Sequence, residues 1–261
     1  MKTTLLLATV CFQLVIAPIS GAAPTRKILK VMNSSWPPFF NAKGSEAYPG
    51  YGLELTKRCL NKSGYEASFD FYPINRMFDY HFKGKLDVAV MSFKESRAKK
   101  LLYSKEPLFI NTYVGFVRAD SKFKYAKLSD LDALTIGHLS GLKTSDEYRH
   151  YIEKRLSKAK DSRVEIVSAD NDNIRKLAAG RIDYFVGSRA TIFWKASQIN
   201  LADRIKEFPH KFKEASYYLT ISKKSNNIAD RAKLIKDFDQ CVTREKKSGW
   251  YKKTRNRYGS P

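Results

Sequence analysis

The chain has few cysteines, few histidines and no long apolar run after its first 22 residues. Its four histidines, His81, His138, His150 and His210, are scattered through 261 residues without the spacing of metal ligands. We therefore predict no metal site and no cofactor. No segment after residue 22 approaches the ~20 apolar residues that span a bilayer. Nucleophile-elbow and P-loop motifs are also absent, which argues against the enzyme classes that use them.

Acidic residues are scarce as well: 26 Asp and Glu stand against 48 Lys and Arg, a formal net charge of +22. Such an excess is compatible with nucleic acid, an anionic envelope surface or an anionic ligand. The basic residues are spread through the whole chain and form no single block with interleaved aromatics. This distribution argues against a nucleic-acid partner and favours long-range attraction of acidic surfaces and ligands.

The first 22 residues have the pattern of a secretory signal peptide. Lys2 precedes an apolar run over 5–16, and small residues at 20–22 form a cleavage site. The alternative is a membrane anchor, but the run is too short for one and Pro18 follows it. We therefore expect export to the periplasm and release of a mature chain.

Two cysteines follow this segment, Cys59 and Cys241. In an oxidising compartment they could form a disulfide, or each could be a small buried hydrophobic residue. Their spacing offers no zinc site, and no histidine constellation suggests a catalytic thiol. The sequence leaves both alternatives open.

One sequence unit occurs twice. GKLDVAV begins at Gly84 and GRIDYFV begins at Gly180, 96 residues later, and a predicted helix precedes each glycine. In both copies a basic residue, an aliphatic residue and an aspartate lead into a buried strand and then a polar loop. This repetition indicates an α/β protein whose two similar lobes face each other across a cleft.

The remaining pattern fits this layout. We predict helices at 52–63, 74–82, 146–158, 173–179 and 228–242. We predict strands at 28–32, 67–72, 86–91, 109–117, 134–137, 164–167, 182–186 and 217–221. Prolines in segment 33–40 favour an extended loop, residues 187–189 are expected as a polar loop, and those after 248 as a short basic tail.

The polar loop after the first repeated strand is the main candidate site. Ser92, Lys94 and Arg97 place a hydroxyl, an ammonium and a guanidinium at the carboxyl end of a strand, where α/β proteins bind ligands. Arg97 can grip a carboxylate with two parallel hydrogen bonds. Arg76, on the polar face of the preceding helix, is a further candidate. The alternative for all four residues is an ordinary solvated surface.

Several motifs occur in the order and spacing of a known family: WPPFF, PGYGLEL, GKLDVAVMSFKESR, LSDLDALTIGHLSG, LAAGRIDYFVG and KKSGWYKKTRNRY. With them the chain resembles the family 3 extracellular solute-binding proteins, the polar amino-acid binders of bacterial uptake systems. The resemblance implies a type II periplasmic-binding-protein fold, an α/β structure of two lobes with a ligand cleft between them. It places the first lobe at 23–117 and 213–261, and an inserted second lobe at 118–212.

The resemblance also implies a ligand clamp. The family's anion end, a hydroxyl and an arginine, matches Ser92 and Arg97, and Lys94 replaces a threonine that is usual in this loop. The second-lobe donors of the family match Lys143 and Thr144. Its covering aromatic matches Trp36, in the loop after the first strand.

The ammonium end of the clamp departs from the family. The usual aspartate falls on Ser188, and Arg189 follows it. A buried ammonium without a carboxylate partner carries a large desolvation penalty. We therefore expect a small anionic or carboxylate-bearing ligand without a free ammonium. Alternatively, Asp183 or a glutamate from elsewhere replaces the missing aspartate.

Three functions fit these observations. We favour a non-catalytic, monomeric periplasmic receptor that traps a small solute by lobe closure and delivers it to the membrane permease of an ABC-type uptake system. The second function is an enzyme on the same scaffold, of the cyclohexadienyl dehydratase kind. A general acid needs a raised pKa, whereas the best-placed acid, Glu95, is flanked by Lys94 and Arg97, which would lower it. The third is a free-standing sensor whose loaded form docks on a membrane receptor.

Overall fold

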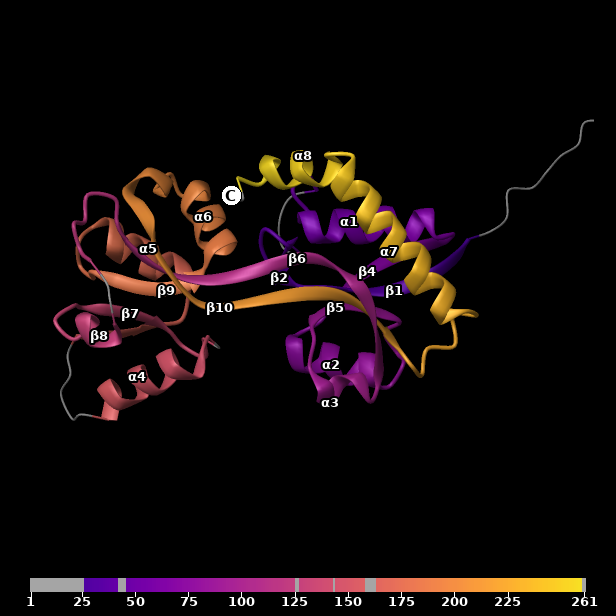
Figure 1. Cartoon of the computed structure of the whole chain (residues 1–261), viewed down its shortest axis with the longest axis horizontal. Coiled ribbons are helices and arrows are strands. Elements are labelled where there is room, and N and C mark those ends of the chain that lie inside the picture. The colour runs from indigo at the N-terminus through magenta and orange to yellow at the C-terminus, as the bar shows by residue number, and fades with distance from the viewer. Residues whose placement is uncertain (1–25, 42–45, 125–126, 143, 158–162, 260–261) are drawn as a thin grey trace, which may run out of the picture.

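The computed structural model describes residues 26–41, 46–124, 127–142, 144–157 and 163–259. Within them the chain forms two lobes that are joined by two long strands (Figure 1). The predicted signal peptide at 1–22 and the predicted site residue Lys143 lie outside these described residues.

In the described part of the chain, an eight-stranded mixed sheet runs through both lobes in the order β4-β1-β5-β10-β6-β9-β7-β8. Its first-lobe part is parallel and consists of β1 (Lys27–Asn33), β4 (Tyr65–Phe71) and β5 (Val88–Ser92). Its second-lobe part is also parallel and consists of β7 (Ile136–Leu139), β8 (Val164–Val167) and β9 (Tyr184–Ser188). The antiparallel connection between them consists of β6 (Leu101–Arg118) and β10 (Ile205–Ser222).

The connecting strands are longer than the predicted strands 109–117 and 217–221. Each has 18 residues, which at about 3.3 Å a residue extends close to 60 Å. The first half of β10 has little apolar periodicity of its own, and it is a strand because it pairs with β6. The predicted lobe boundaries after residues 117 and 212 fall at the end of β6 and inside β10, and they stay a prediction.

Helices cover both faces of the sheet in each lobe (Figure 1). In the first lobe, one face carries α1 (Tyr51–Lys62), α7 (Arg231–Lys247) and α8 (Trp250–Arg257), and the other carries α2 (Ile74–Phe82) and the short α3 (Glu95–Ala98). In the second lobe, α5 (Asp170–Ala178) and α6 (Arg189–Gln198) lie opposite α4 (Asp146–Ser157). The smaller elements are β2 (Ser35–Trp36), β3 (Phe40–Asn41), η1 (Leu128–Leu131) and η2 (Ala202–Arg204).

Each helical layer has an apolar core of its own. Leu55 and Phe238 are fully buried where α1 and α7 meet the sheet, and Met77 is the buried side chain by which α2 packs on the other face. In the second lobe, Ile192 of α6 is buried in the core that α5 and α6 share, and Tyr148 of α4 is buried in the core on the other face. The two-sided covering explains why the central strands are apolar on both faces, as in other parallel sheets.

Three predictions of irregular structure are wrong. The polar loop expected after the first repeated strand contains α3, so that Arg97 lies on a short helix. The expected polar loop at 187–189 leads directly into α6, which begins at Arg189. The expected basic tail contains α8, because its last turn is anchored far away in sequence: the buried Tyr258 hydroxyl receives the N–H of Gly50 (3.0 Å) and donates to Glu54. Neither contact leaves a local sequence pattern.

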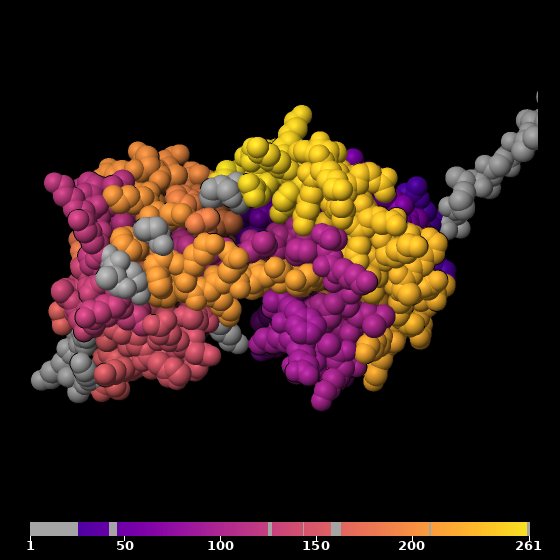
Figure 2. All heavy atoms as spheres, in the orientation of Figure 1, coloured from indigo at the N-terminus to yellow at the C-terminus, as the bar shows by residue number. Residues whose placement is uncertain are grey.

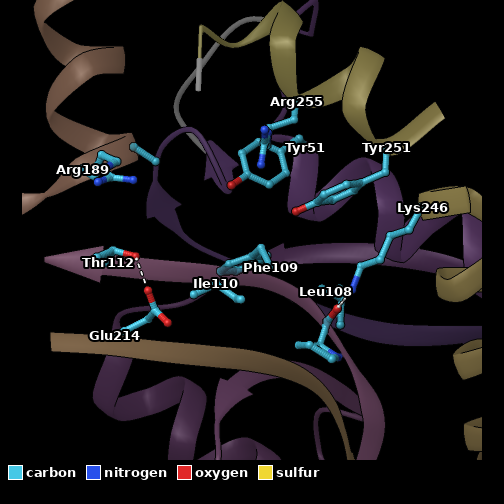
Figure 3. A pocket seen from close by; sticks show the side chains of 12 residues that line it. Tyr51, Leu108, Phe109, Ile110, Thr112, Arg189, Glu214, Lys246, Tyr251 and Arg255 are labelled. Atoms are coloured by element: carbon cyan, nitrogen blue, oxygen red, sulfur yellow. Dashed lines mark hydrogen bonds between the residues drawn. The ribbon is translucent and has the colours of Figure 1, made fainter. Parts of the chain in front are cut away.

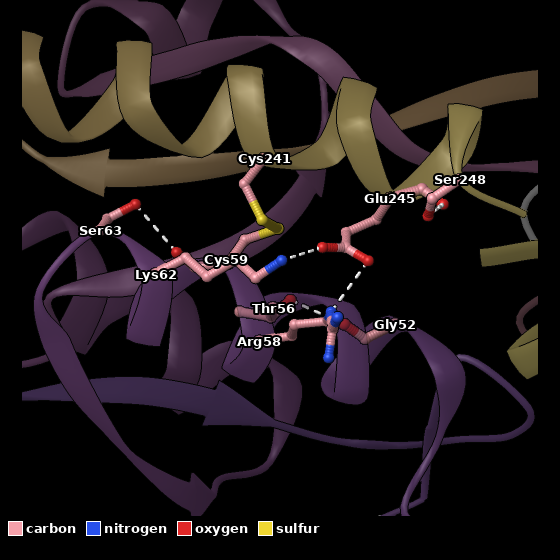
Figure 4. The surroundings of a disulfide bond; sticks show 9 residues. All are labelled: Gly52, Thr56, Arg58, Cys59, Lys62, Ser63, Cys241, Glu245 and Ser248. Carbon is pink, nitrogen blue, oxygen red and sulfur yellow. Dashed lines mark hydrogen bonds and ion pairs between the residues drawn. A yellow bond between two sulfur atoms is a disulfide. The ribbon is translucent and has the colours of Figure 1, made fainter. Parts of the chain in front are cut away.

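A disulfide joins α1 to α7 (Figure 4). Cys59 and Cys241 are both buried, with their Cα atoms 5.5 Å apart. One turn further along α7, the buried carboxylate of Glu245 pairs with Arg58 (2.9 Å) and with Lys62 of α1. Segments 182 residues apart in sequence are therefore held together by a covalent bond with ion pairs beside it.

Loss of the disulfide should weaken the first lobe. A cross-link across a separation of 182 residues restricts the unfolded chain, and removing such a bond costs about 2–5 kcal/mol. We expect the double variant Cys59→Ala, Cys241→Ala to unfold in urea with a free energy lower by that amount. Reduction should shift the native protein to the midpoint of the variant. A native midpoint that reduction leaves unchanged would contradict this prediction.

Glu245 should stabilise the fold only while it is charged. Burial alone would raise the pKa of this carboxyl, but hydrogen bonds from Lys62 and Arg58 outweigh burial, and the net pKa is lowered. A lowered folded-state pKa gives stability that is present above the unfolded-state value of 4.5 and is lost as the pH falls through the folded-state pKa.

We expect Glu245→Gln to lower the free energy of unfolding by about 1–2 kcal/mol near neutral pH, because both partners are partly exposed. The difference from the native protein should shrink when both are unfolded in urea well below the pKa of the carboxyl. An undiminished difference in acid would show that packing, and not charge, explains the effect.

Candidate functional site

A cavity of about 420 Å³ lies at the carboxyl ends of β1, β4 and β5. We call it the cleft cavity. Its lining residues are Met32, Asn33, Ser34, Ser35, Trp36, Phe71, Tyr72, Pro73, Ile74, Met77, Phe78, Val90, Met91, Ser92, Arg97, Tyr113 and Tyr217. The molecule is hollowed between its lobes on the side of α2 and α4 (Figure 2). This is the edge of the sheet at which α/β proteins bind ligands.

Arg97 provides the positive charge of the cleft cavity. It lies on α3, where its Nη1 donates to the carbonyl oxygen of Ser92 (3.1 Å) and its guanidinium lies 4.8 Å from the centre of the Phe78 ring. In the described residues no carboxylate pairs with this guanidinium. A ring face and a carbonyl therefore orient Arg97 and leave other N–H groups for a ligand.

Trp36 belongs to an aromatic cluster as well as to the cavity lining. Its ring centre lies 4.5 Å from that of Phe39, 4.8 Å from that of Tyr217 and 5.7 Å from that of Phe109. The small β2–β3 hairpin positions the ring, because Trp36 pairs with Phe40 across it. Trp36 therefore packs in the aromatic cluster and also lines the cavity, as expected for a core residue and for a ligand cover.

Ser188 is held by the connecting strand. It ends β9 opposite Tyr113 of β6, and its hydroxyl donates to Oδ1 of Asn111 (2.6 Å). Both Ser188 and Asn111 are buried. Burial raises the pKa of Tyr113, and a hydrogen bond with Asn111 opposes this shift. Ser188 thus has a structural partner and does not line the cleft cavity.

The predicted site residues fall into two groups. Trp36, Ser92 and Arg97 come together in the cleft cavity. The structure does not bring the remaining described candidates there. Arg76 and Lys94 are exposed, and Thr144 is buried in the second lobe, where its carbonyl accepts from Lys213 (3.4 Å). Contact of any of them with ligand stays a prediction.

No carboxylate of the described residues lines the cleft cavity. Asp183, the possible substitute for the missing aspartate, precedes β9 and accepts the N–H of Thr135 (2.9 Å), at the end of the strand opposite Ser188. Asp87, its counterpart in the other repeat, accepts the N–H of Lys30 (2.8 Å). Both repeated aspartates brace neighbouring strands at the far end of the sheet.

Tyr113 and Tyr217 line the cavity from the connecting strands and are not among the predicted site residues. Burial raises the pKa of Tyr217 to about 12 and also raises that of Tyr113. Both phenols are therefore protonated near neutral pH and can donate hydrogen bonds. Their positions on predicted strands were visible in the sequence, but the face on which each lies was not.

Among the residues that the structure describes, no group of three or more His, Cys, Asp and Glu could hold a metal ion. His81 is buried between the carbonyl of Leu86 and the hydroxyl of Thr220 (2.9 Å each), and burial lowers its pKa to about 4. Its role is to join α2 to the sheet. No helix in the described ranges is long and apolar enough to cross a membrane.

A comparison of the whole chain with known families identifies the family. Residues 29–261 match the model of the bacterial extracellular solute-binding proteins, family 3. The chain belongs to this family. A search of curated proteins finds no match.

Several solved structures share the fold of this chain. Substrate-binding domain 2 of Lactococcus lactis GlnP, in an open conformation, is 16% identical with a TM-score of 0.67, covering 91% of this chain and 97% of that one. An ancestral arginine-binding protein bound to arginine is 21% identical with a TM-score of 0.61, covering 89% and 98%. A histidine kinase sensor domain with similarity to periplasmic binding proteins is 22% identical with a TM-score of 0.60, covering 88% and 95%.

These comparisons confirm the predicted family and the type II periplasmic-binding-protein fold. The family consists of extracellular solute-binding proteins, and the similar structures are binding proteins or sensor domains. A solute-binding role follows for this chain. The cleft cavity, which lies where the lobes face each other, is the candidate site.

Trp36 should stabilise the fold in addition to lining the cavity. We expect Trp36→Ala to lower the free energy of unfolding in urea by about 2–4 kcal/mol because the aromatic cluster loses a ring that contacts Phe39, Tyr217 and Phe109, and Trp36→Phe to cost much less. Trp250→Ala is the matched control, since that indole lies over the Arg58 guanidinium (4.7 Å) outside the cavity. If Trp36→Ala costs no more than Trp250→Ala, Trp36 acts only as a cover.

Proposed function

We propose that the protein is a periplasmic receptor that captures a small carboxylate-bearing solute without a free ammonium group. The observation that carries this proposal is the charge of the cleft cavity: Arg97 lines it, and no carboxylate of the described residues does. A carboxylate would receive two parallel hydrogen bonds from the guanidinium. An ammonium would lose its hydration without gaining a counter-ion.

The rest of the solute would be apolar. The rings of Trp36, Phe78, Tyr113 and Tyr217 are part of the cavity lining, as is Ile74, which is 56% exposed. Exposed apolar surface at a cleft is favourable only when something covers it. The few neutral donors, such as the hydroxyls of Ser92 and the two tyrosines, would orient the solute.

Capture would use movement of the lobes about β6 and β10. The second lobe, proposed at 118–212, would bring its loop with Lys143 and Thr144 toward the first, so that each lobe supplies part of the hydrogen bonds. The closed form is then stable only with solute bound. We propose that the protein acts as a monomer and passes the solute to an ABC-type permease. Similarity to a substrate-binding domain of a putative amino acid ABC transporter from Streptococcus pneumoniae supports this role.

A second candidate role is that of a sensor. Similarity to a histidine kinase sensor domain, of which 95% is covered, favours it. The two roles share the same cleft and the same solute chemistry, and the genes that neighbour this one would distinguish a permease from a receptor kinase. An enzymatic role has less support because no acid lines the cleft cavity in the described residues.

A thermal-shift screen of the mature chain tests the solute class. Small monocarboxylates and dicarboxylates without an ammonium should raise the melting temperature in proportion to the logarithm of their concentration, because they bind only the folded state. Arg97→Ala should abolish the shift. Arg175→Ala is the charge-matched control, since Arg175 lies exposed on α5 of the second lobe and outside the cavity lining, and it should leave the shift intact.

Stabilisation by ordinary amino acids in preference to these carboxylates would overturn the proposed solute class. It would mean that an acidic group from another part of the chain serves the ammonium. Equal losses in the Arg175 and Arg97 variants would show that net charge, and not the clamp, attracts the anion.

A further inference from the structure

A second cavity, of about 360 Å³, lies on the opposite face of the connecting strands (Figure 3). We call it the back cavity. Ile110 and Thr112 of β6 lie in its floor, whereas Tyr113, the next residue, lines the cleft cavity, as expected for neighbours on a strand. Its walls come from α1, α7 and α8 of the first lobe and from the start of α6 in the second. Its volume is within the range of about 300–1,000 Å³ that is usual for ligand sites.

Two cations of the first lobe face the back cavity without an ion pair in the described residues, although the Glu106 carboxylate partly opposes the effect of burial on the pKa of Lys246. Arg255 of α8 points toward it, and in the described residues the buried Nε of Arg255 has no hydrogen-bond partner. Lys246 of α7 donates to the carbonyl of Pro107 (2.5 Å), and burial lowers its pKa. No carboxylate of the described chain forms an ion pair with either side chain.

The other charged residues of the back cavity are neutralised in pairs. Arg189 pairs with Glu207 (2.5 Å), and Glu214 pairs with Lys211 (3.2 Å). Glu214 also accepts from Thr112 (3.2 Å), as Figure 3 shows. The charge that no ion pair neutralises within the described residues is therefore that of Arg255 and of Lys246, which Glu106 compensates only in part.

Two tyrosine rings line the back cavity together with Arg255 and Lys246. The ring centres of Tyr51 and Tyr251 lie 6.0 Å apart at an angle of 82°, and their hydroxyls turn toward the cavity (Figure 3). Burial raises the pKa of Tyr251 to about 12, so this phenol stays protonated and can donate. Leu108 and Ile110 add aliphatic surface. The cavity thus combines cations, phenolic donors and an apolar wall.

We propose that the back cavity is a second binding site, which takes a small carboxylate that carries a flat apolar ring. The carboxylate would lie between Arg255 and Lys246 and receive charge-assisted hydrogen bonds from them. The ring would pack against the tyrosines in the offset or edge-on arrangements that aromatic pairs prefer. An anion would compensate two cations that burial has partly stripped of water.

The shape of the back cavity depends on how the two lobes are placed relative to each other. Arg255 and Tyr251 lie on α8 of the first lobe, whereas Arg189 and Ala190 begin α6 of the second. A rotation about the connecting strands would change the distance between these two walls. The back cavity is therefore bounded on one side by each lobe, whereas the lining of the cleft cavity comes from the first lobe and the connecting strands.

Benzoate is the probe for this site, and the Arg97→Ala protein is the background, because it lacks the anion clamp of the cleft cavity. We expect this protein to bind benzoate saturably in isothermal titration. Adding Arg255→Gln should weaken the binding at least about tenfold, the loss expected for one charge-assisted contact. Adding Lys252→Gln, which removes an exposed charge from the same helix, should leave the affinity unchanged.

Absence of saturable benzoate binding in the Arg97→Ala protein would overturn the proposal, and so would equal losses with Arg255→Gln and Lys252→Gln. A crystal of the native protein with 4-bromobenzoate provides a second test that needs no variant. A bromine anomalous peak beside Tyr51 and Tyr251 supports the site. A peak beside Arg97 alone would overturn the second site and would still agree with the proposed solute class of the cleft cavity.

Discussion

The antiparallel pairing of β6 and β10 is the constraint on which the rest of the structure depends. Each lobe attaches its parallel strands to one member of this pair: β5 pairs with β10, and β9 pairs with β6. The continuous ladder between Arg118–Ile205 and Leu101–Ser222 therefore sets how the lobes stand relative to each other. Strand twist, and the register shifts of β10 between Phe208 and Lys213, determine the angle between them.

The alternation of side chains along these strands gives the molecule two functional faces. Opposite the cleft, Trp194 of α6 packs against Tyr258 (5.4 Å between ring centres), and Ala190 and Trp194 belong to the apolar core of the first lobe. The present arrangement is thus stabilised by contacts behind the connecting strands. A solute in the cleft cavity changes the arrangement only if its own contacts in the closed form outweigh those behind the strands.

The sequence predicts those parts of the fold that depend on contiguous residues, and it does not predict contacts between distant segments. The two repeated units predict both parallel sheets, and Ser92 and Arg97 could be placed because a strand and its following loop are continuous in sequence. Arg76 shows the limit of such reasoning, since the polar face of α2 is recognisable but the direction of the cavity is not. Tyr217 was missed because its place in the site depends on pairing with Phe109, more than 100 residues away.

Burial distinguishes the few charged residues that indicate a binding site from the many exposed ones that do not. With 48 basic and 26 acidic residues, 22 cations would remain without a carboxylate even if every acidic residue paired with one cation, and an unpaired exposed lysine needs no explanation. Where a charge serves only structure, the chain pairs it: Arg58 and Lys62 surround Glu245. Arg97 is partly buried, and its described partners are the Phe78 ring, the carbonyl of Ser92 and the hydroxyl of Tyr103, all of them uncharged. Because desolvation of a guanidinium is costly, its lack of a carboxylate is understandable if an anion from solution completes the site.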